Sequence, residues 1–188
     1  MIFHFRVLTK INYACKLVKE KINPEFFMDI KIRKFEDRDA ARVAVIMFGS
    51  FRAVFGDLLG TEPKPESYWK EISHSERGGI IVTSFVAETD NNVIGYLRVS
   101  INPGNGLGVL EVIGVDPESF SRGIGKALFA AAEVFWKKNN IRKVYTCTSH
   151  INTNAQAFYK KLGFIEEGRL KDHFHKGLDE IQLGKFYD

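Results

Sequence analysis

Hydrophobic and polar residues alternate along residues 29–188 with two different periods, and each change of period marks an expected element. Alternating apolar positions predict a first strand at residues 30–35. A helix is expected over residues 36–56, because acidic side chains fill its first turn and apolar ones then recur every three or four positions. A second helix is expected over residues 65–76, with Pro65 at its start and Tyr68, Trp69 and Ile72 on one face.

The rest of the pattern predicts a mixed arrangement of strands and helices. Strands at 80–88 and 93–101 flank Asp90-Asn91-Asn92, which predicts a hairpin. After a glycine-rich turn at 103–108, we expect a strand at 109–115, a helix at 122–139, a strand at 142–148, a helix at 153–162, and strands at 164–170 and 181–187. The hairpin interrupts pure βαβ alternation, so the pattern favours a three-layer sandwich of the α/β or α+β class over a fully parallel sheet.

Two short motifs in the second half carry candidate chemistry. The apolar run 109–115 leads into Asp116-Pro117 and then Gly123-Ile124-Gly125 at the expected start of a helix. Unpaired N–H groups and the positive end of the helix dipole bind anions there, and glycine lets a phosphate approach the backbone. The alternative is that both glycines only make a tight turn between strand and helix.

Spacing excludes two better-known phosphate motifs. A P-loop requires glycine and then Ser or Thr at positions that Phe120 and Ala127 occupy here. A dinucleotide-binding fingerprint requires a third glycine where the chain has Leu128. The glycine turn therefore favours neither nucleoside triphosphates nor NAD.

The glycine turn precedes a second motif, Asn154-Ala-Gln-Ala-Phe-Tyr159-Lys-Lys-Leu-Gly163-Phe164, and the pair resembles the GNAT superfamily of N-acetyltransferases. The resemblance covers roughly residues 29–188 and is most specific in the second half. It implies a GNAT-like three-layer sandwich, with a central mixed, mostly antiparallel sheet, a splayed central strand pair and helices on both faces. It also implies that acetyl-CoA, as co-substrate, donates an acetyl group to a primary amine without a metal.

The resemblance assigns the roles of individual residues. The strand before the glycine turn would pair with the pantetheine arm, the turn itself would hold the pyrophosphate, and Asn154 would bind the pantetheine. The implied cofactor-binding residues are Ile113, Gly114, Val115, Ser121, Arg122, Gly123, Ile124, Gly125, Lys126 and Asn154.

One departure from the family pattern concerns the start of the glycine turn. The family usually has Gln or Arg where this chain has Phe120, with Arg122 two residues further on. We expect backbone amides to supply most of the anion binding. The departure also supports an alternative function, a non-catalytic acyl-CoA-binding or regulatory module on the same fold.

The two candidate catalytic residues are Glu111 and Tyr159. An amine must be neutral to attack a thioester, and deprotonating a lysine-like amine at neutral pH costs about 4–5 kcal/mol, which calls for a general base or a water wire. Glu111 lies on the cofactor strand and is the candidate base. The alternative is that Glu111 is only a solvent-facing residue of that strand. Tyr159 is the family-like proton donor to the leaving thiolate, with a core aromatic as its alternative. A strand N–H near Ile113 could polarise the thioester carbonyl.

The composition bounds the remaining function classes. The first 28 residues, expected to form a short helical extension, carry five Lys or Arg and two Glu, or +3 of the net +4. A basic pI concentrated in one tail is weak support for nucleic-acid binding, which is not expected. No stretch reaches the roughly 18 apolar residues of a membrane span, and no secretory signal is recognisable, so we expect a cytoplasmic protein.

Several side chains remain open to more than one reading. Cys147 is expected to pack in the core rather than to accept an acyl group, and His173 and His175 to be surface or pocket residues rather than metal ligands. Arg33, Arg52, Arg98 and Arg169 could meet an acidic substrate or lie on the surface. The identity of the acceptor amine stays open, and exposed C-terminal edge strands would allow a homodimer.

Overall fold

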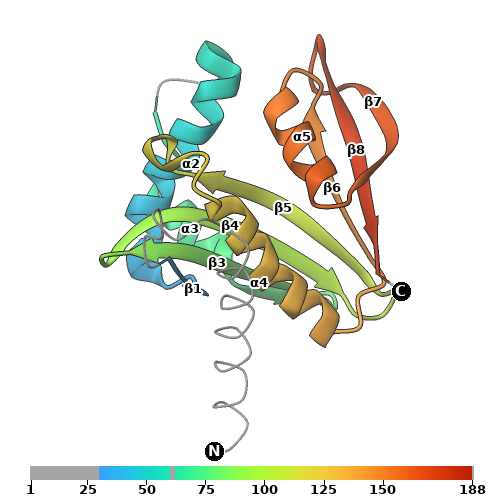
Figure 1. The fold of residues 1–188 in the computed structure, drawn as a ribbon, viewed down its shortest axis with the longest axis horizontal. Coiled ribbons are helices and arrows are strands. Elements are labelled where there is room, and N and C mark those ends of the chain that lie inside the picture. Colours follow the sequence, from blue (N-terminus) through green and yellow to red (C-terminus); the bar gives the residue numbers. More distant parts are fainter. Residues whose placement is uncertain (1–29, 60–61, 188) are drawn as a thin grey trace, which may run out of the picture.

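The computed structural model describes residues 30–59 and 62–187, which form one eight-stranded sheet between two layers of helices (Figure 1). The strand order is β1-β3-β4-β5-β6-β8-β7, and β2 pairs with β3 beside this path. Within these residues every pairing is antiparallel except that of β5 with β6. The mixed, mostly antiparallel sheet expected from the sequence is therefore confirmed.

The elements follow the expected order along the chain. They are β1 (Lys31–Lys34), η2 (Asp37–Asp39), α2 (Ala40–Phe55), η3 (Gly56–Leu59), α3 (Glu66–Ser73), β2 (Ser75–Arg77), β3 (Ile80–Thr89), β4 (Asn92–Asn102), β5 (Leu107–Val115), η4 (Pro117–Ser119), α4 (Ile124–Lys138), β6 (Lys143–Ser149), α5 (Thr153–Lys161), β7 (Ile165–His175) and β8 (Leu178–Phe186).

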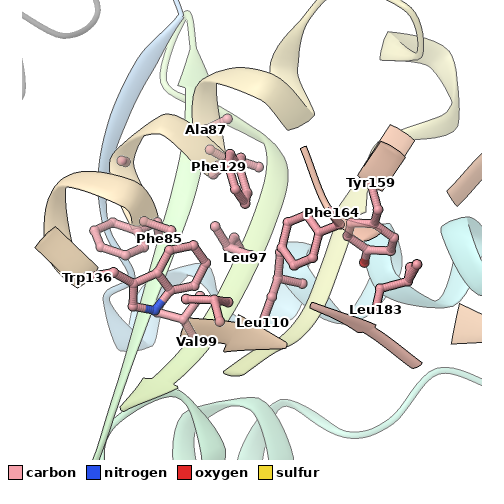
Figure 2. Close-up of a cluster of buried hydrophobic side chains, with 14 of the residues drawn as sticks. Phe85, Ala87, Leu97, Val99, Leu110, Phe129, Trp136, Tyr159, Phe164 and Leu183 are labelled. Carbon is pink, nitrogen blue, oxygen red and sulfur yellow. The ribbon is translucent and has the colours of Figure 1, made fainter. Parts of the chain in front are cut away.

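The apolar faces of these elements form two cores, one on each side of the sheet. On one side α4 and α5 cover a cluster that includes Phe129, Trp136, Tyr159 and Phe164 (Figure 2). On the other side α2 and α3 cover a smaller cluster around Met47, Trp69 and Tyr96. The sheet thus buries both faces, as the three-layer expectation requires.

Two glycines let the helices approach the centre of the sheet closely. A Cβ at Gly114 of β5 would lie 2.5 Å from the Met47 sulfur of α2, and a Cβ at Gly95 of β4 would lie 2.9 Å from an Ile124 methyl of α4. Because both distances are shorter than real Cβ contacts, a side chain at either position would displace the helix side chain that packs there. The helices that flank the end of β5 are therefore held close to it from both faces.

The parallel pair β5 and β6 separates after a short contact. Pairing joins Leu107–Val109 of β5 to Lys143–Tyr145 of β6 and goes no further, although β5 continues to Val115 and β6 to Ser149. At the point of separation the Thr146 hydroxyl donates a 2.8 Å hydrogen bond to the Leu110 carbonyl. Figure 1 shows the two strands diverging from there. The expected splayed central pair is present.

The structure differs from the sequence expectation at two places. The helix expected over 65–76 ends at Ser73, and residues 75–77 instead form β2 against the edge of β3. The last two strands are longer than expected, because side-chain hydrogen bonds extend their hairpin: Asp172 accepts from the Gly177 amide at 2.6 Å and Asp179 accepts from the Asp172 amide at 3.0 Å. The expected helical extension at 1–28 lies outside the described residues.

Candidate active site

The loop after β5 is fixed to the rest of the domain before it reaches the glycines. Asp116 begins the short helix η4 by accepting a 3.2 Å hydrogen bond from the Glu118 amide, and it forms an ion pair with Arg42 of α2. The Ser50 hydroxyl of α2 donates to the Val115 carbonyl at 2.6 Å. Helix α2 therefore sets where β5 ends and where the loop to α4 begins.

The glycine turn presents backbone N–H groups at the start of a fifteen-residue helix, α4. Gly123 lies in the left-handed region with φ of 78°, and Ser121 has φ of 64°. Within the described part of the chain, the amides of Ser121, Gly123 and Ile124 have no hydrogen-bond acceptor. A Cβ at Gly123 would have no atom within 4 Å, so the space outside this turn is open. An anion such as a pyrophosphate fits this set of donors.

Glycine is required at the two positions of the turn for different physical reasons. At Gly125 an added Cβ would lie 3.2 Å from the ring of Phe158 in α5, so the chain's own packing uses the missing side chain there. At Gly123 no packing contact requires glycine, and the positive φ does. The positive φ of Gly123 therefore fits the tight-turn alternative, packing against α5 accounts for Gly125, and the anion-binding role of the turn stays a prediction.

A β-bulge in β5 aims Glu111 at the face that α2 and α3 cover. Arg98 of β4 pairs with Val112 and Val99 pairs with Leu110, which leaves Glu111 as the extra residue. Consequently Glu111 and Val112 both line the same pocket, whereas Leu110 belongs to the core on the opposite face. Glu111 forms an ion pair with Arg98. Sequence reasoning placed Glu111 on the cofactor strand but could not foresee this partner.

The pocket beside Glu111 has a volume of about 330 Å³. It lies between α2, α3 and the strands β4 and β5, and most of its wall is apolar. The lining residues are Ala44, Met47, Phe48, Phe51, Glu62, Lys64, Tyr68, Trp69, Ile72, Arg98, Glu111 and Val112.

Tyr159 lies on the opposite side of the sheet from this pocket, in the core beneath α5. Its side chain is 5% exposed and packs against Phe158. It also packs against Phe164, which lies beside it in Figure 2. Burial raises the pKa of Tyr159 to about 12, although a hydrogen bond with Thr146 acts in the opposite direction. Because Thr146 also marks the separation of β5 and β6, the phenol lies at the splay. The structure thus places Tyr159 in the core, as the core-aromatic alternative expected, and its role as a proton donor stays a prediction.

The remaining sequence-predicted residues lie around the two strand ends. Asn154 is exposed in the first turn of α5, and Lys126 is exposed in the first turn of α4. Asn152, which the sequence reasoning did not single out, caps α5 by accepting a 3.1 Å hydrogen bond from the Ala155 amide. Phe120, where the family pattern has Gln or Arg, is exposed at the end of η4.

Cys147 and Glu180 form a second cluster that sequence reasoning did not find. Cys147 pairs with Gln182 and Ser149 with Glu180, so these side chains share the face opposite Thr146. Cys147 is a half-buried free thiol and belongs to neither core, which corrects the core-packing expectation. Burial and then the charge of Glu180 raise the pKa of the Cys147 thiol, and a protonated thiol is a poor nucleophile.

Glu180 is 7% exposed and has no ion-pair partner among the described residues. Burial raises the pKa of its carboxyl, although the charges of His173, His150 and His175 act in the opposite direction. The burial of this carboxyl cannot be predicted from a single sequence, because it depends on the segments that pack against Glu180 in the folded chain. His173 and His175 themselves are exposed on β7.

Two of the four arginines considered as anion contacts, Arg33 and Arg169, are bound to carboxylates away from the described pocket. Arg33 donates to both Asp39 and Glu88 at 2.6–2.8 Å. Arg169 donates to Asp179 at 2.7 Å. The Arg52 guanidinium lies 5.7 Å from the centre of the Phe48 ring. Arg98 alone among the four lines the described pocket.

Comparison with known proteins matches residues 46–164 to the family model of the acetyltransferase (GNAT) family. A mycothiol acetyltransferase from Arthrobacter sp. is 31% identical over 81 residues, which is 41% of this chain and 25% of that protein. An uncharacterized N-acetyltransferase from Methanocaldococcus jannaschii is 32% identical over 109 residues, 55% of this chain and 46% of that protein. The chain thus spans a quarter to about half of these relatives.

Solved structures share the fold. Ard1 from Thermoplasma volcanium superposes with a TM-score of 0.69 at 19% identity, covering 85% of this chain and 98% of that one. The PaiA N-acetyltransferase from Thermoplasma acidophilum, solved in complex with coenzyme A, gives 0.63 at 22% identity, covering 85% and 100%. No helix in the described part of this chain is long and apolar enough to cross a membrane.

Proposed function

Because the chain belongs to the acetyltransferase (GNAT) family, we propose that it transfers an acetyl group from acetyl-CoA to a primary amine by direct attack, with both substrates bound at once. The observation that carries the proposal is the placement of Glu111 and Tyr159. Glu111 faces a pocket on the α2 side of the sheet, and Tyr159 lies on the α5 side, where β5 and β6 separate. An amine and a thioester could therefore meet at the splay from opposite faces.

Three groups of residues would bind the cofactor. The amides and side chains of Ser121, Arg122, Gly123, Ile124, Gly125 and Lys126 would hold the pyrophosphate. The unpaired edge of β5 at Ile113, Gly114 and Val115 would pair with the pantetheine, and Asn154 would contact it from α5. The open space at Gly123 and the amides without acceptors support this assignment.

Glu111 would take a proton from the acceptor ammonium, and Tyr159 would give one to the departing sulfur. The neutral nitrogen attacks the thioester carbonyl carbon, a C–N bond forms and the C–S bond breaks. The sulfur leaves as a thiol with the proton from Tyr159, the second proton of the nitrogen passes through solvent to restore the phenol, and the proton held by Glu111 goes to solvent. No acyl-enzyme is needed, and the protonated Cys147 thiol is unsuited to form one. Burial keeps Tyr159 in the protonated form that this role requires.

Glu180 is a second candidate base, because burial moves the pKa of its carboxyl upward. The two candidates are separated by the pH dependence of kcat/KM in Glu111→Gln and Glu180→Gln. We expect Glu111→Gln to lower kcat by roughly a hundredfold and Glu180→Gln to leave most activity. Loss of the acidic limb of the pH profile in Glu180→Gln alone would transfer the role to Glu180.

Release of free thiol from acetyl-CoA in the presence of a panel of amines tests the proposed activity. Thiol release together with an acetylated product by mass spectrometry is the expected result. Calorimetric binding of CoA without turnover on any amine would favour the non-catalytic acyl-CoA-binding module. Absence of both binding and turnover would contradict both functions.

The proposal includes a cytoplasmic location and allows a homodimer. The free thiol Cys147 is typical of reducing compartments. Strand β7 is at the edge of the sheet, where a second copy could pair with it. Sedimentation of the purified chain at several concentrations would measure the oligomeric state.

A further inference from the structure

The pocket beside Glu111 has features that restrict which amine it accepts, and this inference rests on the proposed function. Its wall is formed mainly by aliphatic and aromatic side chains from α2 and α3. Tyr68 and Trp69 meet edge to face, with ring centres 5.2 Å apart. Such a wall binds an apolar group by removing it from water.

The charges around the pocket balance. The lining contains two acids, Glu62 and Glu111, and two bases, Lys64 and Arg98. Lys64 lies over the ring of Tyr68, with its nitrogen 5.9 Å from the ring centre. A polyamine carries several positive charges and would require an acidic wall, so this pocket does not suit it.

The volume limits the size of the bound group. A pocket of about 330 Å³ is near the lower end of the roughly 300–1,000 Å³ found for small-molecule sites. It can hold a body comparable to one large amino-acid side chain with its backbone atoms. A ligand of several linked rings, such as a large antibiotic, would extend outside it.

The Arg98–Glu111 pair at the pocket wall has unused hydrogen-bonding capacity of both kinds. Arg98 uses Nη2 to contact Oε2 of Glu111, and its Nη1 has no hydrogen-bond acceptor among the described residues. Oε1 of Glu111 also has no hydrogen-bond donor within the described part of the chain. The side chains are 20% and 22% exposed. A ligand with an ammonium group next to an oxygen acceptor can therefore contact both members of the pair.

We propose that the acceptor is an α-amino acid unit with a large apolar side chain, either free or at the start of a peptide. Its amine contacts Glu111, its neighbouring carbonyl or carboxylate oxygen contacts the Arg98 guanidinium, and its side chain lies among Phe48, Phe51 and Trp69. The reaction forms the amide of the α-nitrogen and releases CoA as a thiol, as in the proposed function. Glu111 then serves both to bind the ammonium and to accept its proton.

A panel of four amines, assayed with the wild-type protein, tests separately the amine, the oxygen and the apolar body of the proposed acceptor. Phenylalaninamide carries the amine, the oxygen and the aromatic body; glycinamide lacks the aromatic body, phenethylamine lacks the oxygen, and spermidine is a polycation. We expect kcat/KM for phenylalaninamide to exceed that for each of the other three by roughly tenfold or more. Equal values for phenylalaninamide and either glycinamide or phenethylamine, or a preference for spermidine, would overturn the inference.

Two further substrates distinguish the sources of the α-amino unit. Free phenylalanine and a phenylalanyl peptide share the reacting amine and differ in the group bonded to the carbonyl carbon. A higher kcat/KM for the free amino acid indicates a metabolite, and a higher value for the peptide indicates a protein N-terminus. Either result agrees with the inference, provided that the preference over glycinamide holds.

Variants assign the selectivity to individual side chains. Arg98→Met should reduce the ratio of kcat/KM between phenylalaninamide and phenethylamine to near one, and Phe51→Ala should reduce the ratio between phenylalaninamide and glycinamide. Phe186→Ala, at the exposed end of β8, is the matched control and should keep both ratios. CoA affinity shows whether each variant is folded. If Arg98→Met does not fold, the order of the four amines on the wild-type protein decides the inference.

The outcomes also separate this inference from the proposed function. Thiol release with the wrong order of amines contradicts only the acceptor class. Failure to release thiol with any amine contradicts the proposed acetyltransferase activity itself.

Discussion

At the scale of single residues, Tyr159 shows how burial holds a side chain in its protonated form. The phenol is enclosed by aromatic neighbours and by Thr146, and its pKa is raised to about 12 by that burial. It therefore remains protonated at every pH at which the protein would work. A tyrosine in water, with a pKa of about 10, would begin to lose this proton sooner.

The substitution Tyr159→Phe should lower kcat by roughly a hundredfold while leaving the KM for acetyl-CoA almost unchanged, because only the donated proton is lost. Steady-state thiol release measures both parameters. The packing around the ring should persist, so we expect stability to change by no more than about 1.5 kcal/mol. An unchanged kcat would leave Tyr159 as a core aromatic only.

Arg33 shows a different use of charge, since its partners are buried and structural. Its hydrogen bonds with Asp39 and Glu88 raise the pKa of the guanidinium, against the effect of burial. Burial acts to raise the pKa of Asp39, but hydrogen bonds from Arg33 and the Glu36 amide keep it below its usual value. The hydrogen bond from Arg33 likewise lowers the pKa of Glu88.

Arg33→Met should destabilise the fold by about 3 kcal/mol at neutral pH, because two poorly solvated carboxylates lose their partner. Carboxyls with lowered pKa values contribute stability above their unfolded pKa and lose it as the pH falls through the folded one. The difference between wild type and variant should therefore shrink below about pH 4. Urea unfolding at pH 7 and pH 3.5 measures this, and a difference that does not depend on pH would contradict the ionic explanation.

At the scale of elements, the loop between β5 and α4 is held at its two ends by helices from opposite faces of the sheet. Helix α2 holds the end of β5 through Ser50 and Arg42, and Phe158 of α5 packs over Gly125. Between these anchors, Gly123 adopts a positive φ, and a Cβ added there would meet no atom within 4 Å. The shape of the turn is thus fixed by its ends, and its middle is available to a ligand.

Gly123→Ala should weaken CoA binding by roughly tenfold, because a left-handed alanine costs about 1–2 kcal/mol and the turn can relax to avoid that cost. Gly177→Ala is the matched control: Gly177 also has a positive φ and open surroundings, but it lies in the turn between β7 and β8. Both variants should lose similar stability, and only Gly123→Ala should lose CoA affinity by calorimetry. Equal CoA affinities would indicate that the turn does not hold the cofactor.

At the scale of the whole molecule, the sheet and its two helical layers are complete within the described residues. Both faces of the sheet are covered, and the candidate site is built from α2, α3, α4, α5 and the central strands. The domain boundary near residue 29 remains a prediction from the sequence.

A chain shortened to residues 29–188 should keep its CoA affinity and its kcat within about twofold, since the proposed functional groups all lie in that part. Calorimetry and thiol release on both chains provide the comparison. Binding of either chain to a random DNA duplex at increasing salt is the accompanying control, because any charge-driven binding from the basic tail should disappear on truncation. Loss of folding in the shortened chain would show that the extension belongs to the domain.

The sequence by itself determined the features that depend on neighbours along the chain. The periods of apolar residues predicted nearly every strand and helix. The splayed strands were implied by the resemblance of the glycine turn and of the Tyr159 motif to the GNAT superfamily. The end of α3 and strand β2 were missed, because residues 75–77 become a strand only by pairing with β3.

Only the tertiary structure decided which side chains meet across elements. The bulge that turns Glu111 toward Arg98, the enclosure of Glu180 and the packing of Phe158 on Gly125 each join segments distant in the sequence. Periodicity fixes which face a residue occupies, but burial, charge partners and pKa depend on what other segments place against that face. Local pattern therefore sufficed for the fold and its family, whereas the ion pair and the pocket that bear on the acceptor required the folded chain.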